Sequence, residues 1–241
     1  MGMRFVLGCW TLMMGFAGST VAGQSVDDQV ERLLEQVGGR DVWAEATGFH
    51  MVEVLEDANL PLPAIREYWV DFERPRIMER TITSTLNQLQ ALNELEGWIV
   101  RDAETSTWSA EEVAGWRGFW PGIPTRVFHL LASDDPSVEV DLRDGNRLDI
   151  RVDGRFAVWI GLSDDGTPVA YGREESHTST HFLGRMEEYG GVRLWTAAYE
   201  PGDMWKVTMV DYDLFDKVLP VSFGLPHDRG SHRPDPRGGE M

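Results

Sequence analysis

Apolar residues recur at helical spacing near the start of the chain. Ser25 precedes this run and is followed three positions later by Asp28, which is the pattern of a capping box at a helix N-terminus. Gly38-Gly39 comes after the run and is typical of a helix end. The apolar positions lie at i, i+3, i+4 and i+7, on one helical face: Val30, Leu33, Leu34 and Val37. The spacing therefore predicts an amphipathic helix, followed by a short second helix over 41–47.

From His50 the period of the pattern changes to two, which is typical of half-buried strands. Turn-forming pairs such as Asp144-Gly145, Asp153-Gly154 and Asp165-Gly166 separate several of these alternating segments. The alternation predicts strands near 50–56, 65–73, 76–83, 86–93, 97–101, 138–142, 147–152, 155–162, 168–175, 181–189, 192–199 and 204–212.

A second helical segment interrupts the strands in the middle of the chain. Ser109 with Glu112 forms another capping box, the segment 120–124 breaks the helix, and residues 125–131 resume it. Because a long twisted sheet curls, helices packed against its concave face give the simplest closure. We therefore expect an α+β fold, a curled antiparallel sheet forming an incomplete barrel of about ten strands. The N-terminal helix packs on this sheet, and the mid-chain insertion acts as its lid.

The two ends of the chain differ from this pattern. Residues 1–23 combine a positive start, an apolar run and small residues, which predicts a cleaved secretory signal peptide and export to the periplasm. Val6-Leu7-Gly8-Cys9 is weakly similar to a lipidation motif, although only four residues separate Cys9 from Arg4. No stretch is long and apolar enough for a transmembrane span. We expect one domain over 24–226 and a disordered polar tail over 227–241.

Composition narrows the classes of partner and chemistry. Cys9 is the sole cysteine, so the mature chain forms no disulfide. The formal net charge of −18 disfavours nucleic acid as a partner. A glycine-rich phosphate loop and a G-x-S-x-G elbow are both missing from the sequence, and we expect a protein without enzymatic activity or cofactor. His177 and His181 lie about 13 Å apart if they share a strand, so no metal site is expected there.

Two patterns leave alternatives open. Tryptophans occur within the expected strands, at Trp98, Trp159, Trp195 and Trp205. Such residues pack in a core, or form an aromatic face that stacks on sugars. The many acidic residues leave room for a secreted hydrolase with dispersed carboxylates. A carbohydrate-binding module and a secreted hydrolase are therefore two candidate functions.

The segment Phe72-Glu73-Arg74-Pro75 carries a resemblance to a known family. A strand ending in F-x-R-P, the later segment 96–102 (EGWIVRD) and the closing segment 215–226 are similar in order to the periplasmic lipoprotein-carrier (LolA/LolB-like) superfamily. The resemblance implies an unclosed barrel lidded by helices, with an apolar cavity for a lipid or for the acyl chains of a lipoprotein. It also implies a role in carriage to the outer membrane, with an envelope protein as a further partner.

Period two along the strand that leads into this segment places four residues on the inner face of the sheet, namely Tyr68, Val70, Phe72 and Arg74. With Trp98, these residues form the expected ligand-binding set. The resemblance implies that Arg74 latches the lid through hydrogen bonds to lid backbone. The alternative is a bulge at Pro75 that turns Arg74 outward to pair with Glu73 or Glu79.

The signal peptide yields a direct prediction. The exported protein should begin near Gly23, Gln24 or Ser25, because small residues end the apolar run there. N-terminal sequencing of protein purified from the periplasm checks this. A mature product that retains an acylated Cys9 would contradict it.

Overall fold

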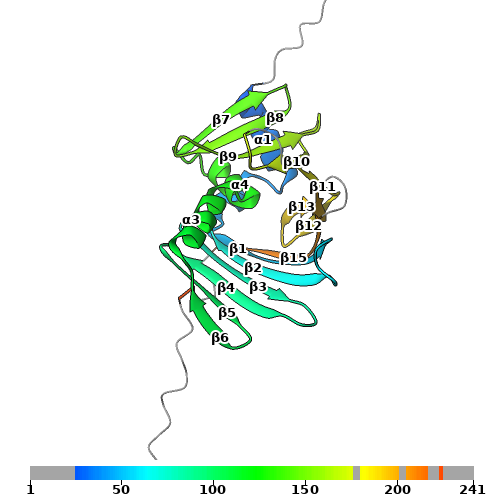
Figure 1. The fold of residues 1–241 in the computed structure, drawn as a ribbon. Coiled ribbons are helices and arrows are strands. Elements are labelled where there is room, and N and C mark those ends of the chain that lie inside the picture. The colour runs from blue at the N-terminus through cyan, green and yellow to red at the C-terminus, as the bar shows by residue number, and fades with distance from the viewer. Residues whose placement is uncertain (1–24, 176–179, 201–204, 217–222, 225–241) are drawn as a thin grey trace, which may run out of the picture.

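The computed structural model describes residues 25–175, 180–200, 205–216 and 223–224 (Figure 1). The expected signal peptide and polar tail, and His177, lie outside these residues. The helices are α1 (Val26–Gln36), α2 (Arg40–Glu45), α3 (Ala110–Phe119), the 3-10 turn η1 (Trp120–Gly122) and α4 (Pro124–Ala132). The first strands are β1 (Gly48–Asp57), β2 (Ala64–Asp71), β3 (Arg76–Ile82), β4 (Asn87–Asn93), β5 (Glu96–Arg101) and β6 (Glu104–Thr107). The later strands are β7 (Val138–Arg143), β8 (Arg147–Val152), β9 (Arg155–Leu162), β10 (Pro168–Gly172), β11 (His181–Leu183), β12 (Met186–Tyr189), β13 (Val192–Trp195), β14 (Ala197–Tyr199) and β15 (Trp205–Phe215).

Thirteen strands form one antiparallel sheet in the order β6-β5-β4-β3-β2-β1-β15-β14-β11-β10-β9-β8-β7, and β12 and β13 form a separate hairpin. Strands β6 and β7 are the two edges, so the sheet does not close into a barrel. The predicted α+β class with a curled, unclosed sheet, an N-terminal helix and a mid-chain helical segment is confirmed. In Figure 1, α3 and α4 lie between the two ends of the curled sheet.

The sheet has more strands than expected for two local reasons. Two segments predicted as single strands, 181–189 and 192–199, are each divided, because Gly184 and Thr196 leave the ladder. The Gly184 N–H donates to the carbonyl of Ala197, where the chain passes from one pairing to the next. Strand β6 lacks apolar alternation, and all four of its residues are exposed. Its pairing with β5 follows from the turn at Asp102-Ala103, not from burial.

The helices carry the expected caps and build the core. Ser25 and Asp28 form the predicted capping box of α1, and Ser109 and Glu112 form that of α3. The α1 side chains Leu33 and Leu34 are fully buried. The main core fills the space between the helices and the concave face of the sheet, and includes Trp43, Phe49, Phe72, Phe128 and Tyr212.

The helical insertion approaches the sheet closely at one glycine. A Cβ at Gly122 would lie 2.3 Å from the backbone oxygen of Ala157 on β9, whereas a Cβ at Gly118 in α3 would meet nothing within 4 Å. Gly122 is therefore where the insertion docks, backbone against backbone.

We expect Gly122→Ala to lower the free energy of unfolding by about 1–3 kcal/mol, because the added methyl overlaps backbone that cannot yield easily. Gly118→Ala is the matched control and should raise it by about 0.5–1 kcal/mol, since alanine favours the exposed helix. Urea unfolding followed by circular dichroism measures both. Equal effects of the two substitutions would contradict the close docking.

Candidate functional site

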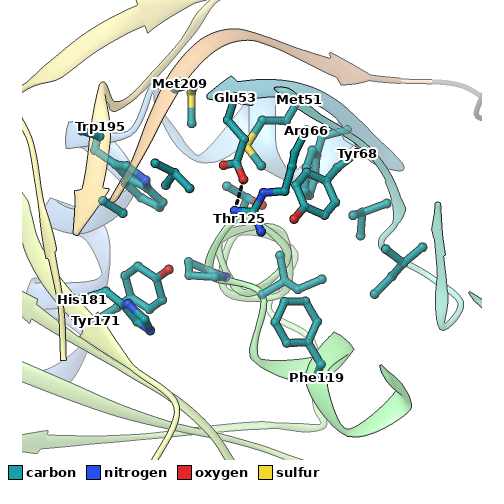
Figure 2. Close-up of a pocket in the computed structure, with 18 of the residues that line it drawn as sticks. Met51, Glu53, Arg66, Tyr68, Phe119, Thr125, Tyr171, His181, Trp195 and Met209 are labelled. Atoms are coloured by element: carbon teal, nitrogen blue, oxygen red, sulfur yellow. Dashed lines mark ion pairs between the residues drawn. The ribbon is translucent and has the colours of Figure 1, made fainter. Parts of the chain in front are cut away.

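A cavity of about 240 Å³ lies between the concave face of the sheet and the helical insertion (Figure 2). Strands β1, β2, β3 and β15 contribute apolar side chains to it, namely Phe49, Met51, Val70, Ile77, Val207 and Met209. The helical side contributes Phe119, Ile123 and Pro124. These groups make most of the wall apolar.

The pairing register explains why these side chains meet. Phe49 is opposite Val70, and Val70 is opposite Ile77, across β1, β2 and β3. Directly opposed residues share a face of the sheet, and alternate residues of each strand return to that face. The alternation in the sequence therefore places a continuous apolar strip on the concave side.

The strip becomes polar farther along β1 and β2. Glu53 is opposite Arg66 in the register, and their side chains form an ion pair inside the cavity (Figure 2). Burial raises the pKa of Glu53, and the attraction of Arg66 opposes this rise. A buried ion pair costs desolvation energy and is weak evidence for stability. The pair therefore gives an otherwise apolar cavity one polar end.

A second polar group faces this ion pair from β10 and β11. The rings of Tyr171 and His181 lie 4.7 Å apart, and both line the cavity. Burial lowers the pKa of His181; the carboxylate of Glu200 opposes this shift, and the nearby Arg173 adds to it. The Arg173 guanidinium lies 3.5 Å from the ring centre of Phe119 on α3, so it connects the sheet to the insertion.

Two residues of the expected ligand-binding set lie where the sequence predicted. Tyr68 and Val70 both line the cavity. Phe72 points the same way but lies deeper, in the core, 5.9 Å from Phe49 and 5.2 Å from His129 between ring centres.

Trp98 lies on the opposite face of the sheet. It packs in a separate cluster with Met78, Ala91 and Phe223, and its indole N–H donates to the Phe223 carbonyl over 2.9 Å. It pairs in register with Ala91, which is opposite Met78, and these residues alternate with the cavity-facing Ile77. This parity therefore places Trp98 away from the cavity that Tyr68 and Val70 line, and not beside them as expected.

The expected inner-face position of Arg74 is also corrected. Strand β2 ends at Asp71, whose carboxylate accepts the backbone N–H groups of Glu73 and Arg74 and so turns the chain out of the sheet. The Arg74 side chain is 58% exposed and faces Glu94 at 3.5 Å. The outward alternative is the arrangement observed, with Glu94 as the partner in place of Glu73 or Glu79.

The physical role assigned to Arg74 is filled by residues of the insertion itself. The Trp120 indole donates to the Asp71 carbonyl over 2.7 Å, and Arg126 Nε donates to the Phe72 carbonyl over 2.9 Å. The Arg126 guanidinium also lies 3.5 Å from the Trp120 ring centre, and burial lowers its pKa to about 10. The expected latch had a donor on the strand and carbonyls on the lid. The structure has the reverse, with carbonyls at the end of β2 and donors on the helical insertion.

At the other end of α4, a third side chain satisfies the helix terminus. Arg40 of α2 donates to the carbonyls of Leu131 and Ala132 over 3.0 and 2.7 Å. These are orphan acceptors of the last helical turn. Sequence reasoning missed both Arg40 and Arg126; the signal for Arg126 was a cation inside the otherwise apolar segment 125–131.

Other sequence expectations concern metal and membrane. His181 lines the cavity, and His177, with which no metal site was expected, lies outside the described residues. Within the described ranges, no cluster of three or more His, Cys, Asp or Glu side chains is placed to hold a metal ion. The helices described in this structure are too short or too polar to cross a membrane.

Comparisons with known proteins show distant likenesses in fold. No family model matches the chain, and no curated protein matches it. A DUF1329 family protein from Desulfovibrio piger is similar over 78% of this chain and 91% of its own, with 10% identity and a TM-score of 0.41. The structure of MucB is similar over 77% of this chain and 57% of its own, with 16% identity and a TM-score of 0.21.

The reversed latch yields a matched pair of variants. Arg126→Leu should lower the free energy of unfolding by about 1.5–3 kcal/mol, because the Phe72 carbonyl loses a charged donor. Arg74→Leu should change it by less than about 0.5 kcal/mol, since it removes only an exposed ion pair. Urea unfolding measures both, and hydrogen exchange should report faster opening of α4 in Arg126→Leu alone. A larger loss in Arg74→Leu would restore the latch to that residue.

Proposed function

We propose that this protein is an exported binding or carrier protein that holds the apolar part of a lipid-like ligand, such as an acyl chain, in the cavity. The observation that carries the proposal is the apolar wall formed where the concave sheet meets the insertion. Protein interiors are otherwise packed to the density of organic crystals, so an apolar space of this size is suited to a ligand.

The size of the cavity limits the ligand. Small-molecule sites span about 300–1,000 Å³, and this cavity of about 240 Å³ is just below that range. It suits one acyl chain or part of a longer one. Each buried methylene contributes about 0.8 kcal/mol, so a chain of moderate length offsets the cost of ordering it.

The insertion provides a means of entry. Every residue of α4 except His129 is buried, whereas no residue of α3 is. Helix α3 meets its surroundings through Phe119 and through Trp116, which stacks on Trp108 with 5.3 Å between ring centres. We therefore assign α3 as the part of the lid that opens, and α4 as its fixed base.

The predicted signal peptide supports a periplasmic location, where acylated lipoproteins and free lipids are the available apolar ligands. A carbohydrate-binding role has less support, because Trp98, Trp159 and Trp195 are buried and offer no open stacking face. The hydrolase alternative stays a hypothesis; of the described residues that line the cavity, Glu53 is the one carboxylate.

Filling the cavity tests the proposal. Met51→Trp should weaken binding of a fluorescent fatty-acyl probe at least tenfold, because the larger ring occupies the space of several methylenes, each worth about 0.8 kcal/mol. Val52→Trp is the matched control, because Val52 adjoins Met51 on β1 and faces the other side of the sheet. This variant should bind the probe as the wild type does.

Fluorescence titration gives the affinities, and circular dichroism establishes that both variants are folded. A wild-type protein that ignores the probe, or two variants that bind it equally well, would overturn the proposed function.

A further inference from the structure

The polar end of the cavity contains an arginine that has no carboxylate partner among the residues that the structure describes. Arg173 follows β10 and lines the cavity. Its Nε is shielded from solvent and has no hydrogen-bond partner among the described residues. Burial lowers the pKa of Arg173, and no carboxylate of the described residues is among the groups that oppose this shift.

The other arginines in this region are compensated differently. Arg66 has Glu53 as its ion-pair partner, and Arg126 donates to the Phe72 carbonyl. A cation withdrawn from water is costly unless it is paired or hydrogen-bonded. Arg66 Nε and one terminal nitrogen of Arg126 also lack partners, but Arg173 differs from both residues because it has neither an ion pair nor a hydrogen bond among the described residues.

The orientation of Arg173 leaves room for that anion. The ring of Phe119 lies against the guanidinium, 3.5 Å from its carbon to the ring centre. Stacking uses the face of the guanidinium, whereas its N–H donors lie in its plane and form a fork that matches carboxylate and phosphate oxygens. The stacked arrangement thus orients the group without consuming its donors.

Further donors face the same space. Figure 2 shows the hydroxyl groups of Tyr68 and Tyr171 directed into the cavity from opposite walls. The Nδ1 atom of His181 is shielded from solvent and makes no hydrogen bond within the described residues; the nearest carboxylate oxygen, of Glu200, lies 3.7 Å away. Hydroxyl groups and an imidazole N–H are donors suited to an anionic oxygen group.

We propose that this end of the cavity binds the anionic head, a carboxylate or a phosphate, of an amphipathic ligand whose chain lies along the apolar wall. Arg173 is the charge partner of the head, and Tyr68, Tyr171 and His181 are its additional donors. The inference rests on the proposed function, because the chain and the head belong to one ligand. It adds that the protein distinguishes anionic amphiphiles from neutral ones.

The net charge makes this selection stricter. The chain carries a formal charge of −18, so it repels small free anions at long range. Burial of the alkyl chain of the ligand is needed to offset that repulsion. We therefore expect inorganic phosphate or acetate alone to bind far more weakly than an alkyl anion.

The test compares ligands that share one chain and differ in the head. Dodecanoic acid and dodecyl phosphate present an anion, and dodecanol is the neutral match. Each competes with a fluorescent fatty-acyl probe for the wild type, for Arg173→Gln, for Arg173→Lys and for a control, Arg185→Gln. Arg185 is 80% exposed and its partner is Glu187, away from the cavity.

We expect the wild type and Arg185→Gln to prefer at least one of the two anions over the alcohol by about tenfold to a hundredfold, the usual value of hydrogen bonds to a charged group. Which anion is preferred identifies the head. Arg173→Gln should lose that preference and still bind dodecanol, which also shows that its cavity is intact. Arg173→Lys should keep only part of the preference, because an ammonium lacks the planar fork.

The outcomes separate this inference from the proposed function. Binding of dodecanol as tight as that of both anions in the wild type, or an unchanged preference in Arg173→Gln, would overturn the head-group site and leave the apolar cavity standing. If none of the alkyl compounds displaces the probe from the wild type, both the head-group site and the proposed function are overturned.

Discussion

Pairing between β1 and β15 holds the two halves of the sheet together, and the cavity exists because of it. Strand β1, from Gly48 to Asp57, pairs with β15, from Trp205 to Phe215. Most of the sequence lies between these two strands. Closing so long a loop costs entropy that grows only slowly with length, but such distant pairing slows folding. Nearly all other sheet contacts are between neighbours in sequence, so this ladder alone makes one curved surface of two meanders.

An irregularity in that ladder shapes the site. The register shifts between Val52 and Glu53, so that Val210 on β15 has no opposite residue. A bulge of this kind bends a strand and reverses its parity. It allows both Met209 and Tyr212 to face the core, although they are three residues apart, while Val210 is turned outward and is 57% exposed. The concave surface is thereby extended past the point where regular alternation would have ended it.

The sequence predicted much of this fold because its signals are local. Capping boxes at Ser25 and Ser109 and the period-two alternation depend on near neighbours, and Tyr68 and Val70 follow from the same alternation. Arg74 was misplaced because a carboxylate three residues earlier, Asp71, turns the chain out of the sheet before the period can continue. The polar residues of the cavity were missed for a different reason. Glu53, Arg66 and Arg173 interrupt the hydrophobic pattern, and only the register of β1 with β2, together with the fold that brings β10 to the same cavity, shows that they face one space.

The contrast between the two helices of the insertion links the site to movement. Trp120 of η1 and Arg126 of α4 donate to carbonyls at the end of β2, and Arg40 of α2 donates to carbonyls of α4; movement of α4 would leave these acceptors unsatisfied. Among the described residues, helix α3 has no such bonds to the sheet, and Phe119 against Arg173 is its contact with the far wall of the cavity. An anion that engages the in-plane donors of Arg173 would hold the guanidinium in the orientation that Phe119 stacks upon. The bound head and the closed lid would then favour each other, as linkage requires of two events that share one side chain.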